Sequence, residues 1–454
     1  MKQGEITAYL SLVFILLTAF VGSVMESASI QIAKNYRRAD MNRALECVFA
    51  EYQKDLLEEY DIFALDVSYE SGSYQEEQMT DRLNYYGAAN LEQKILRIQY
   101  LTDDGCQAFF EQVAAYMEHK YGLDKAQDML GKTDVWEKQQ EDSERYQEDA
   151  QEKEAGLEDL LTENEGELPA EDNPISHVGE LKASPILAQV TPREMQISDK
   201  KINLSDTVSH RQLNKGRGDF SDVAEETGTL SMLLFGEYVL EHFQTAADEK
   251  GTDALDYQVE YILEGKASDR ENLEAVAGKL LLLRFVPNYV YLQSDSAKKA
   301  EAEALAATLC TLLALPEVTE AAAQVILLAW AYGESVVDVR SLLSGNRVAV
   351  VKSETTWQLQ LSGLLKLGTG EDTSEGMDAE GGLKYQDYIR MLLFLEKKEN
   401  AGLRSLDLME QNLRKAKGQK YFRADFCVSK VEYSSTCTLR RGIRYKFPTY
   451  FGYR

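Results

Sequence analysis

The sequence predicts an α+β fold that is mainly helical and is joined to one N-terminal transmembrane helix. Three observations lead to this prediction: a lipid-length apolar segment near the N-terminus, helical periodicity through most of the remaining chain, and strand-like segments near both ends. At 454 residues the chain is long enough for two or three domains. Its 44% of hydrophobic residues indicates a folded protein.

Twenty consecutive uncharged residues, 6–25, lie between Glu5 and Glu26. A helix of this length covers about 30 Å of hydrocarbon at about 1.5 Å per residue. Cleaved signal peptides usually have a shorter apolar region of about 7 to 15 residues, so an anchor is favoured over a signal. We expect residues 1–33 to form a single-pass membrane anchor, with 6–25 in the lipid bilayer. The later uncharged stretches 304–316 and 321–333 are too short to span and are typical of core helices.

The helical pattern continues beyond the apolar segment, because apolar residues follow one helix face as far as Leu56. We therefore expect one helix over 6–60, about 80 Å long. Strands are expected at 62–69 and 95–101, followed by a helix at 106–121. Residues 34–130 are thus interpreted as a stalk helix and an N-terminal α+β part.

Residues 134–172 contain sixteen acidic and three basic residues, and four prolines lie within 131–220. Such a charged run repels itself and has little to bury, which favours a flexible spacer or a solvated helix. No EF-hand spacing supports calcium binding. We expect 131–220 to be an acidic, proline-containing linker that is partly disordered.

Helix signals are dense in 221–420, which predicts a helical bundle. One signal is a capping box, in which Ser268 and Glu271 bond reciprocally at a helix start. The tail, 421–454, is rich in aromatic and β-branched residues and predicts two or three strands. We expect the segment 62–69 to pair with 426–433, which would form a small sheet from the two ends of the chain.

The composition excludes several kinds of site. A net charge of −27 disfavours nucleic acid, since phosphate contacts need clustered basic residues. The four histidines lack metal-binding spacing, and no GxGxxG or GxSxG motif occurs, so we expect no metal, no cofactor and no catalytic residues. The five cysteines are too scattered for a disulfide scaffold. Only Cys427 and Cys437 could pair, across a hairpin.

One candidate pocket remains, at Trp330, Glu334, Asp338 and Arg340. Glu334 and Asp338 lie at positions i and i+4 of a predicted helix and could form an acidic pair in a pocket. The alternative is an internal salt-bridge network. An acidic pocket would suit a membrane-tethered hydrolase or sensor, which is the second hypothesis for function.

Several segments together carry a family resemblance: 2–12 (KQGEITAYLSL), 26–28 (ESA), 45–52 (LECVFAEY), 58–63 (EEYDIF), 255–262 (LDYQVEYI) and 329–335 (AWAYGES). The chain resembles an uncharacterised Gram-positive, Clostridia-type family of membrane proteins that accompanies Tad (tight adherence) pilus systems. Its N-terminus is similar to pilin-like proteins of the TadE and TadG type.

The resemblance implies a non-enzymatic structural or assembly component of a Tad-like pilus or secretion apparatus. It also implies other Tad-like pilus or membrane components as partners, and a large domain outside the cytoplasm at the cell membrane. The positive-inside rule implies instead that the large domain lies in the cytoplasm. The basic residues that follow the apolar segment are Lys34, Arg37, Arg38 and Arg43. Cleavage after Gly4, as in a pilin precursor, would make Tyr9 the fifth residue of the mature chain. Pilins usually carry a glutamate at this position, so the resemblance does not imply that this chain is cleaved there.

Overall fold

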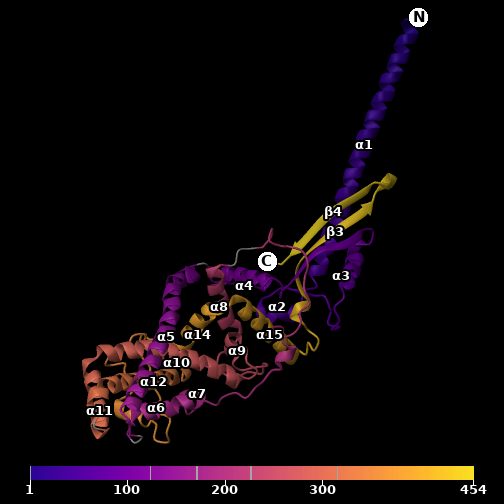
Figure 1. Cartoon of the computed structure of the whole chain (residues 1–454). Coiled ribbons are helices and arrows are strands. Elements are labelled where there is room, and N and C mark those ends of the chain that lie inside the picture. The colour runs from indigo at the N-terminus through magenta and orange to yellow at the C-terminus, as the bar shows by residue number, and fades with distance from the viewer. Residues whose placement is uncertain (1, 123, 170–171, 225–227, 314, 454) are drawn as a thin grey trace. The chain divides into compact units, whose positions relative to one another are not determined.

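A computed structural model describes residues 2–122, 124–169, 172–224, 228–313 and 315–453. It confirms the mainly helical α+β fold with a small antiparallel sheet (Figure 1). The chain divides into two compact units. Unit 1 contains Met1–Ala115, Gln212–Glu226 and Lys417–Arg454, and unit 2 contains Tyr116–Arg211 and Thr227–Ala416. Each unit therefore combines segments that are far apart in sequence.

Unit 1 begins with α1 (Lys2–Phe49), and the prediction that this helix continues to residue 60 is wrong. The chain reverses after Phe49, and α2 (Lys54–Tyr60) starts a separate helix. Gln53 directs this reversal: its backbone N–H donates to the carbonyl oxygen of Ala64 at 2.8 Å, and its side chain caps α2 by accepting from the Asp55 N–H. Neither glycine nor proline marks the break, so the local pattern gave no sign of it.

The sheet of unit 1 joins the two ends of the chain. Its strands are β1 (Leu65–Asp66), β2 (Glu92–Tyr100), β3 (Cys427–Thr438) and β4 (Arg444–Gly452), and β3 pairs antiparallel with each of the others. Leu65 lies opposite Val428, which confirms the predicted pairing of the two chain ends, although β1 is only two residues long. β2 confirms the strand predicted at 95–101, and the tail forms two strands.

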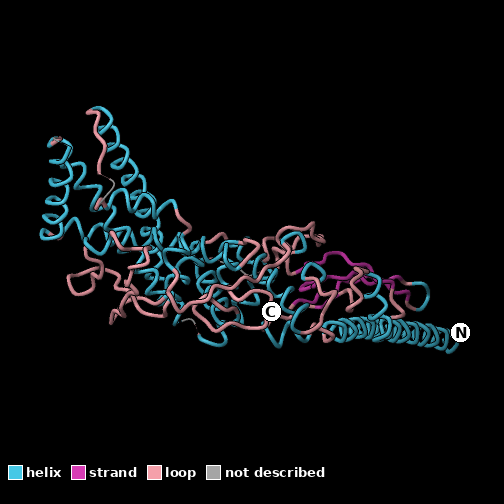
Figure 2. The backbone as a smooth tube through the Cα atoms, turned by 90° about the horizontal axis from the view of Figure 1, so that it is seen from below, coloured by secondary structure: helices cyan, strands magenta, loops and turns pink. Residues whose placement is uncertain are grey.

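The core of unit 1 lies between the C-terminal half of α1 and the sheet, which run alongside each other in both views (Figures 1 and 2). Met41, Leu45 and Val48 of α1 are at most 1% exposed and belong to one cluster with Val431 and Phe447. Burying a side chain of this size stabilises a fold by roughly 1.5 to 3 kcal/mol. The other α-helices described in this region are α3 (Glu76–Leu83), which continues into the π-helix η1 (Asn84–Ala88), and α4 (Gln107–Tyr121), which contains the boundary between the units.

The disulfide that the sequence left possible between Cys427 and Cys437 does not form, because both residues belong to β3. Ten residues of strand span about 33 Å, whereas a disulfide needs Cα atoms within about 7 Å. None of the five cysteines, which all lie within the described residues, forms a disulfide. The hairpin turn lies instead after Thr438, between β3 and β4.

Unit 2 is helical. It contains α5 (Asp124–Glu163), α6 (Pro174–Ala183), α7 (Ile186–Val190), α8 (Thr229–His242), α9 (Gln258–Glu264), α10 (Asp269–Ser294), α11 (Ser296–Leu313), α12 (Thr319–Leu343), α13 (Leu361–Leu364), α14 (Tyr385–Leu395) and α15 (Lys398–Ala416). The predicted capping box is confirmed at the start of α10: the Ser268 side chain accepts from the Glu271 N–H, and the Glu271 carboxylate accepts from the Ser268 N–H.

The acidic segment differs from the expected linker, because α5 is a 40-residue helix that packs within unit 2. The ring of Trp136 lies 5.6 Å from that of Phe394, and Tyr146 lies 6.2 Å from Tyr289. One apolar face thus holds α5 while its charged face meets solvent. The remainder of 131–220 is also divided, since residues from Gln212 onward belong to unit 1.

The central helix of unit 2 is α12, which packs against α5, α10 and α11. The most apolar stretch of this helix has the composition expected of a membrane span, yet 89% of that stretch is buried within the protein. Gly333 allows a close approach here, because a Cβ atom at this position would lie 2.3 Å from Leu364 Cδ1. The interpretation of 321–333 as part of a core helix is therefore confirmed.

Candidate functional site

The predicted acidic pair forms a buried ionic cluster in unit 2. Glu334 and Asp338 lie one turn apart on α12, and their side chains have no exposed surface. Lys352, from the loop after α12, places its Nζ 2.5 Å from Glu334 Oε1 and 2.7 Å from Asp338 Oδ1. A single ammonium group therefore bridges both carboxylates.

The other carboxylate oxygens are also engaged. Asp338 Oδ2 accepts hydrogen bonds from Arg284 Nε and Asn288 Nδ2 of α10, both at 3.0 Å. Glu334 Oε2 accepts from the backbone N–H of Leu359 at 2.7 Å. Two carboxylates thus face two cations, and the cluster is electrically balanced.

Burial shapes the electrostatics of this cluster. It raises the pKa of the Glu334 carboxyl, and the adjacent Lys352 ammonium opposes that shift. This arrangement corresponds to an internal salt-bridge network, the alternative to an acidic pocket in the sequence interpretation. A carboxylate that acts on a substrate has to reach it, and both of these carboxylates are enclosed by protein groups.

The four predicted residues do not converge on one pocket. Trp330 is 1% exposed, and its indole Nε1–H donates to the carbonyl oxygen of Leu359 at 2.8 Å. Arg340 turns to a different group, with Nη1 2.7 Å from Asp372 Oδ2 and Nε donating to the Gln189 carbonyl oxygen at 2.6 Å. Trp330 therefore lies beside the ionic cluster, whereas Arg340 belongs to a separate ion pair.

Lys352 is the member of the cluster that sequence reasoning missed. It directly follows the apolar run 348–351, in a segment that interrupts the helical period. A lysine beside such a run, after a helix that carries two carboxylates in its apolar interior, is a signal for a buried bridging cation. Arg284 carried a similar signal as a lone charge within the apolar face of α10.

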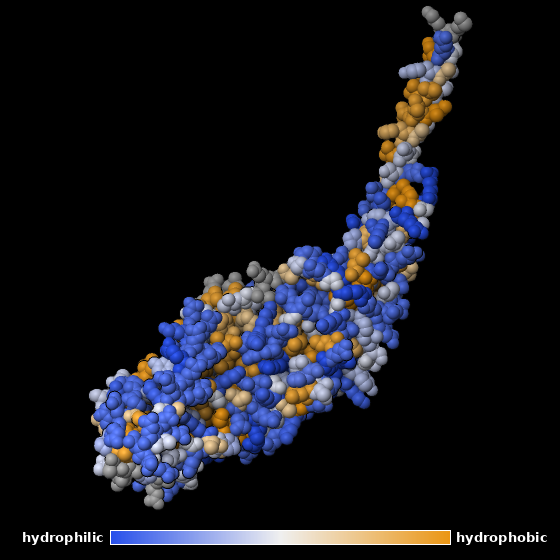
Figure 3. Space-filling model, viewed as in Figure 1, coloured by the Kyte–Doolittle hydropathy of each residue, from blue (hydrophilic) through white to orange (hydrophobic). Residues whose placement is uncertain are grey.

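The other candidate site is the surface of α1. Its most apolar stretch has a mean hydropathy of 2.2 and no buried residues, and Figure 3 shows hydrophobic side chains gathered on this part of the helix. Phe14 and Phe20 are 69% and 68% exposed. The helix is long and apolar enough to cross a membrane.

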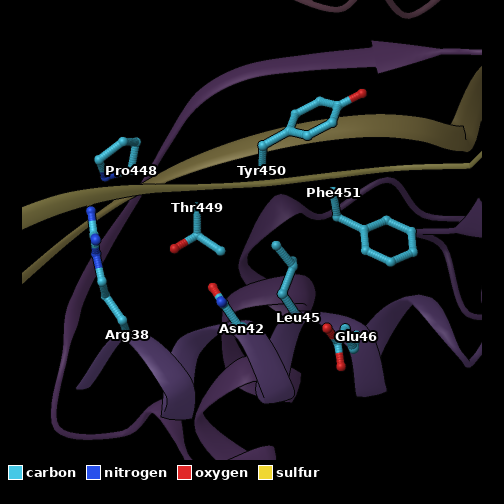
Figure 4. Close-up of a pocket in the computed structure, with 8 residues that line it drawn as sticks. All are labelled: Arg38, Asn42, Leu45, Glu46, Pro448, Thr449, Tyr450 and Phe451. Carbon is cyan, nitrogen blue, oxygen red and sulfur yellow. The ribbon is translucent and has the colours of Figure 1, made fainter. Parts of the chain in front are cut away.

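A groove lies where α1 meets β4 (Figure 4). Its volume is about 350 Å³. The residues that line it are Arg38, Asn42, Leu45 and Glu46 of α1 and Pro448, Thr449, Tyr450 and Phe451 of β4. Among the residues that the structure describes, no group of three or more histidine, cysteine or acidic side chains is placed to hold a metal ion. The groove thus lies within unit 1, between the helix and the hairpin.

The chain is thus a two-unit α+β protein with a long apolar helix at its N-terminus. One unit is helical, and in the other a small sheet packs on the C-terminal half of that helix, whose N-terminal half is apolar and exposed. The chain belongs to a family of unknown function, DUF5702, whose model matches residues 164–439. The matched range begins after α5 and ends just beyond β3. No curated protein and no solved structure matches the chain.

Proposed function

We propose that this chain is a non-enzymatic, single-pass protein of the cell membrane that serves as a structural or assembly component of a Tad-like pilus or secretion apparatus. The observation that carries the proposal is α1: its N-terminal half is apolar and exposed, and its C-terminal half is packed in the core of unit 1.

The exposed half of α1 requires an apolar environment. Ile6, Phe14 and Phe20 are each more than half exposed, and covering such a side chain is worth roughly 1.5 to 3 kcal/mol. A bilayer supplies this cover for all of them. Because α1 is one continuous helix from Lys2 to Phe49, unit 1 is coupled to the membrane segment without a flexible hinge. Such a coupling suits a load-bearing or assembly role better than a loose tether.

The resemblance to proteins of the TadE and TadG type supports the pilus role and an extracytoplasmic body. We therefore place unit 2 outside the cytoplasm, against the positive-inside rule. Partners in this proposal are other Tad-like membrane components, reached through the lipid segment or through unit 1. We do not propose the hydrolase or sensor, because Glu334 and Asp338 are enclosed by Lys352 and Arg284.

Membrane anchoring is tested by carbonate extraction of cells that produce the full chain. Leu12→Arg/Leu16→Arg places two charges in the middle of the apolar segment, each of which costs about 2.5 to 3.5 kcal/mol at the centre of a bilayer. This variant should leave the membrane fraction. Tyr85→Arg/Leu96→Arg is the matched control, because both side chains are exposed in unit 1 outside the segment, and it should stay. A wild-type chain that is itself extracted would contradict the anchor.

Sidedness and role are tested in intact cells that carry the apparatus. Externally added protease should digest unit 2, and protection of unit 2 would contradict the extracytoplasmic placement.

Removing the chain should abolish surface filaments. Wild type and Lys352→Met/Glu334→Gln chains, in which the buried charges stay balanced, should restore them, whereas Leu12→Arg/Leu16→Arg should not. Unchanged filaments in cells that lack the chain would contradict the pilus role.

A further inference from the structure

The turn of the β3–β4 hairpin lies at the end of the apolar segment of α1. Arg441 Nη1 is 2.5 Å from Oε1 of Glu26, the first charged residue after residues 6–25. The apolar segment is as long as the hydrocarbon core is thick, about 30 Å. If it occupies the bilayer, the membrane surface falls at Glu26, and the turn lies at the depth of the lipid headgroups.

The inward face of the hairpin fixes this position. Phe447 is 1% exposed in the core beside α1, and the Arg38 guanidinium lies 5.9 Å from the centre of its ring. One turn of α1 nearer the apolar segment, Lys34 Nζ lies 5.1 Å from the centre of the Tyr445 ring. The hairpin is thus attached along α1 from the core to its turn, as the parallel course of the two in Figure 1 shows.

The turn has the chemistry of an anion-binding surface. Arg440, Arg441 and Arg444 are all exposed, and the side chain of Arg441 keeps 74% of its surface. Residues 433–454 contain five basic and no acidic residues, in a chain of net charge −27. Guanidinium groups donate paired hydrogen bonds to phosphate oxygens. Ile443, 37% exposed between the arginines, adds an apolar side chain of the kind that enters the headgroup boundary.

We propose that this turn, residues 439–444, binds the phosphate groups of anionic phospholipids at the surface where α1 leaves the bilayer. The inference rests on the proposed membrane insertion of residues 6–25. An anionic surface repels the strongly acidic remainder of the chain and attracts this turn. The contact therefore sets the depth and rotation of α1 in the membrane.

The test uses the full chain in nanodiscs with two tryptophan reporters. Ile443→Trp reports on the turn, and Phe14→Trp reports on insertion of α1, while the three native tryptophans all belong to unit 2. Emission is measured with brominated phosphatidylglycerol or brominated phosphatidylcholine at the same mole fraction in a mixed bilayer. The fluorescence of the tryptophan at position 14 should be quenched equally by both brominated lipids. Position 443 should be quenched at least about twice as strongly by the anionic lipid, and less so in about 1 M salt.

A charge variant and a matched control complete the test. Arg440→Gln/Arg441→Gln/Arg444→Gln in the Ile443→Trp chain should bring the quenching ratio of the two lipids to about one. The control, Arg193→Gln/Arg270→Gln/Lys366→Gln, removes the same charge from side chains of unit 2 that are at least half exposed, and should keep the preference.

The outcomes separate this inference from the proposed function. Quenching at position 14 with none at 443, or with no preference for the anionic lipid at 443, would overturn the inference and leave the anchor intact. Equal loss of preference in the control variant would also overturn it, because bulk charge would then be the cause. An unquenched position 14 would refute the anchor itself.

Discussion

Removing Lys352 should destabilise unit 2 more than any surface charge change. Its ammonium group is fully buried and is the bridge between Glu334 and Asp338. In Lys352→Met the apolar stem is retained and the charge is lost. Arg284 alone then balances two buried carboxylates, so the cluster carries an uncompensated negative charge.

The magnitude follows from the cost of leaving a buried charge unpaired. Breaking a buried ion pair from one side costs about 3 to 5 kcal/mol, since the remaining carboxylate loses its partner and cannot regain water. For a unit of this size, that loss lowers the melting temperature by roughly 10 °C. The matched control is Lys366→Met: its ion pair with Glu371 is 3.4 Å long and exposed, and such pairs contribute about 0 to 1 kcal/mol.

Tryptophan fluorescence measures this loss directly, because all three tryptophans lie in unit 2 and Trp330 lies beside the cluster. Urea unfolding should show the lowered stability for Lys352→Met. Lys352→Met/Glu334→Gln should regain a large part of it, since the second change restores neutrality. A loss below about 1 kcal/mol for Lys352→Met, or no recovery in the double variant, would refute the view that charge balance holds this core together.

Three further predictions concern stability. Burial raises the pKa of Glu260 to about 7 from an ordinary value of 4.5, so the folded state holds this proton more tightly. The free energy of unfolding should therefore fall by about 3 kcal/mol as the pH rises from about 4.5 to 7, and Glu260→Gln should flatten this slope in urea titrations at several pH values. Leu45→Ala, at a position 1% exposed between α1 and the sheet, should cost about 2 to 5 kcal/mol, seen as earlier proteolysis of unit 1; an unchanged rate would contradict the packing. Ser268→Ala removes the cap of α10 and should cost about 1 kcal/mol, whereas Ser268→Asp should retain most of the stability.

Local sequence patterns determined several secondary-structure elements of this protein. The twenty uncharged residues specify an apolar helix, because length and composition alone match the thickness of a bilayer. The Ser268 and Glu271 pair specified the start of α10, since a capping box needs only residues three apart. The pairing of the two chain ends was also predictable in outline, because strand-like segments lie near both ends of the chain.

Three features could be seen only in the tertiary structure: the end of α1, the packing of α5 and the buried ion-pair network. Each depends on contacts between residues that are far apart in sequence. The reversal after Phe49 is fixed by the bond from Gln53 to Ala64, not by a breaker residue. The acidic helix α5 is held by aromatic contacts to partners more than a hundred residues away. Likewise, two carboxylates on one helix are compatible with a pocket as well as with an ion-pair network. The arrival of Lys352 and Arg284 from other segments made them a network.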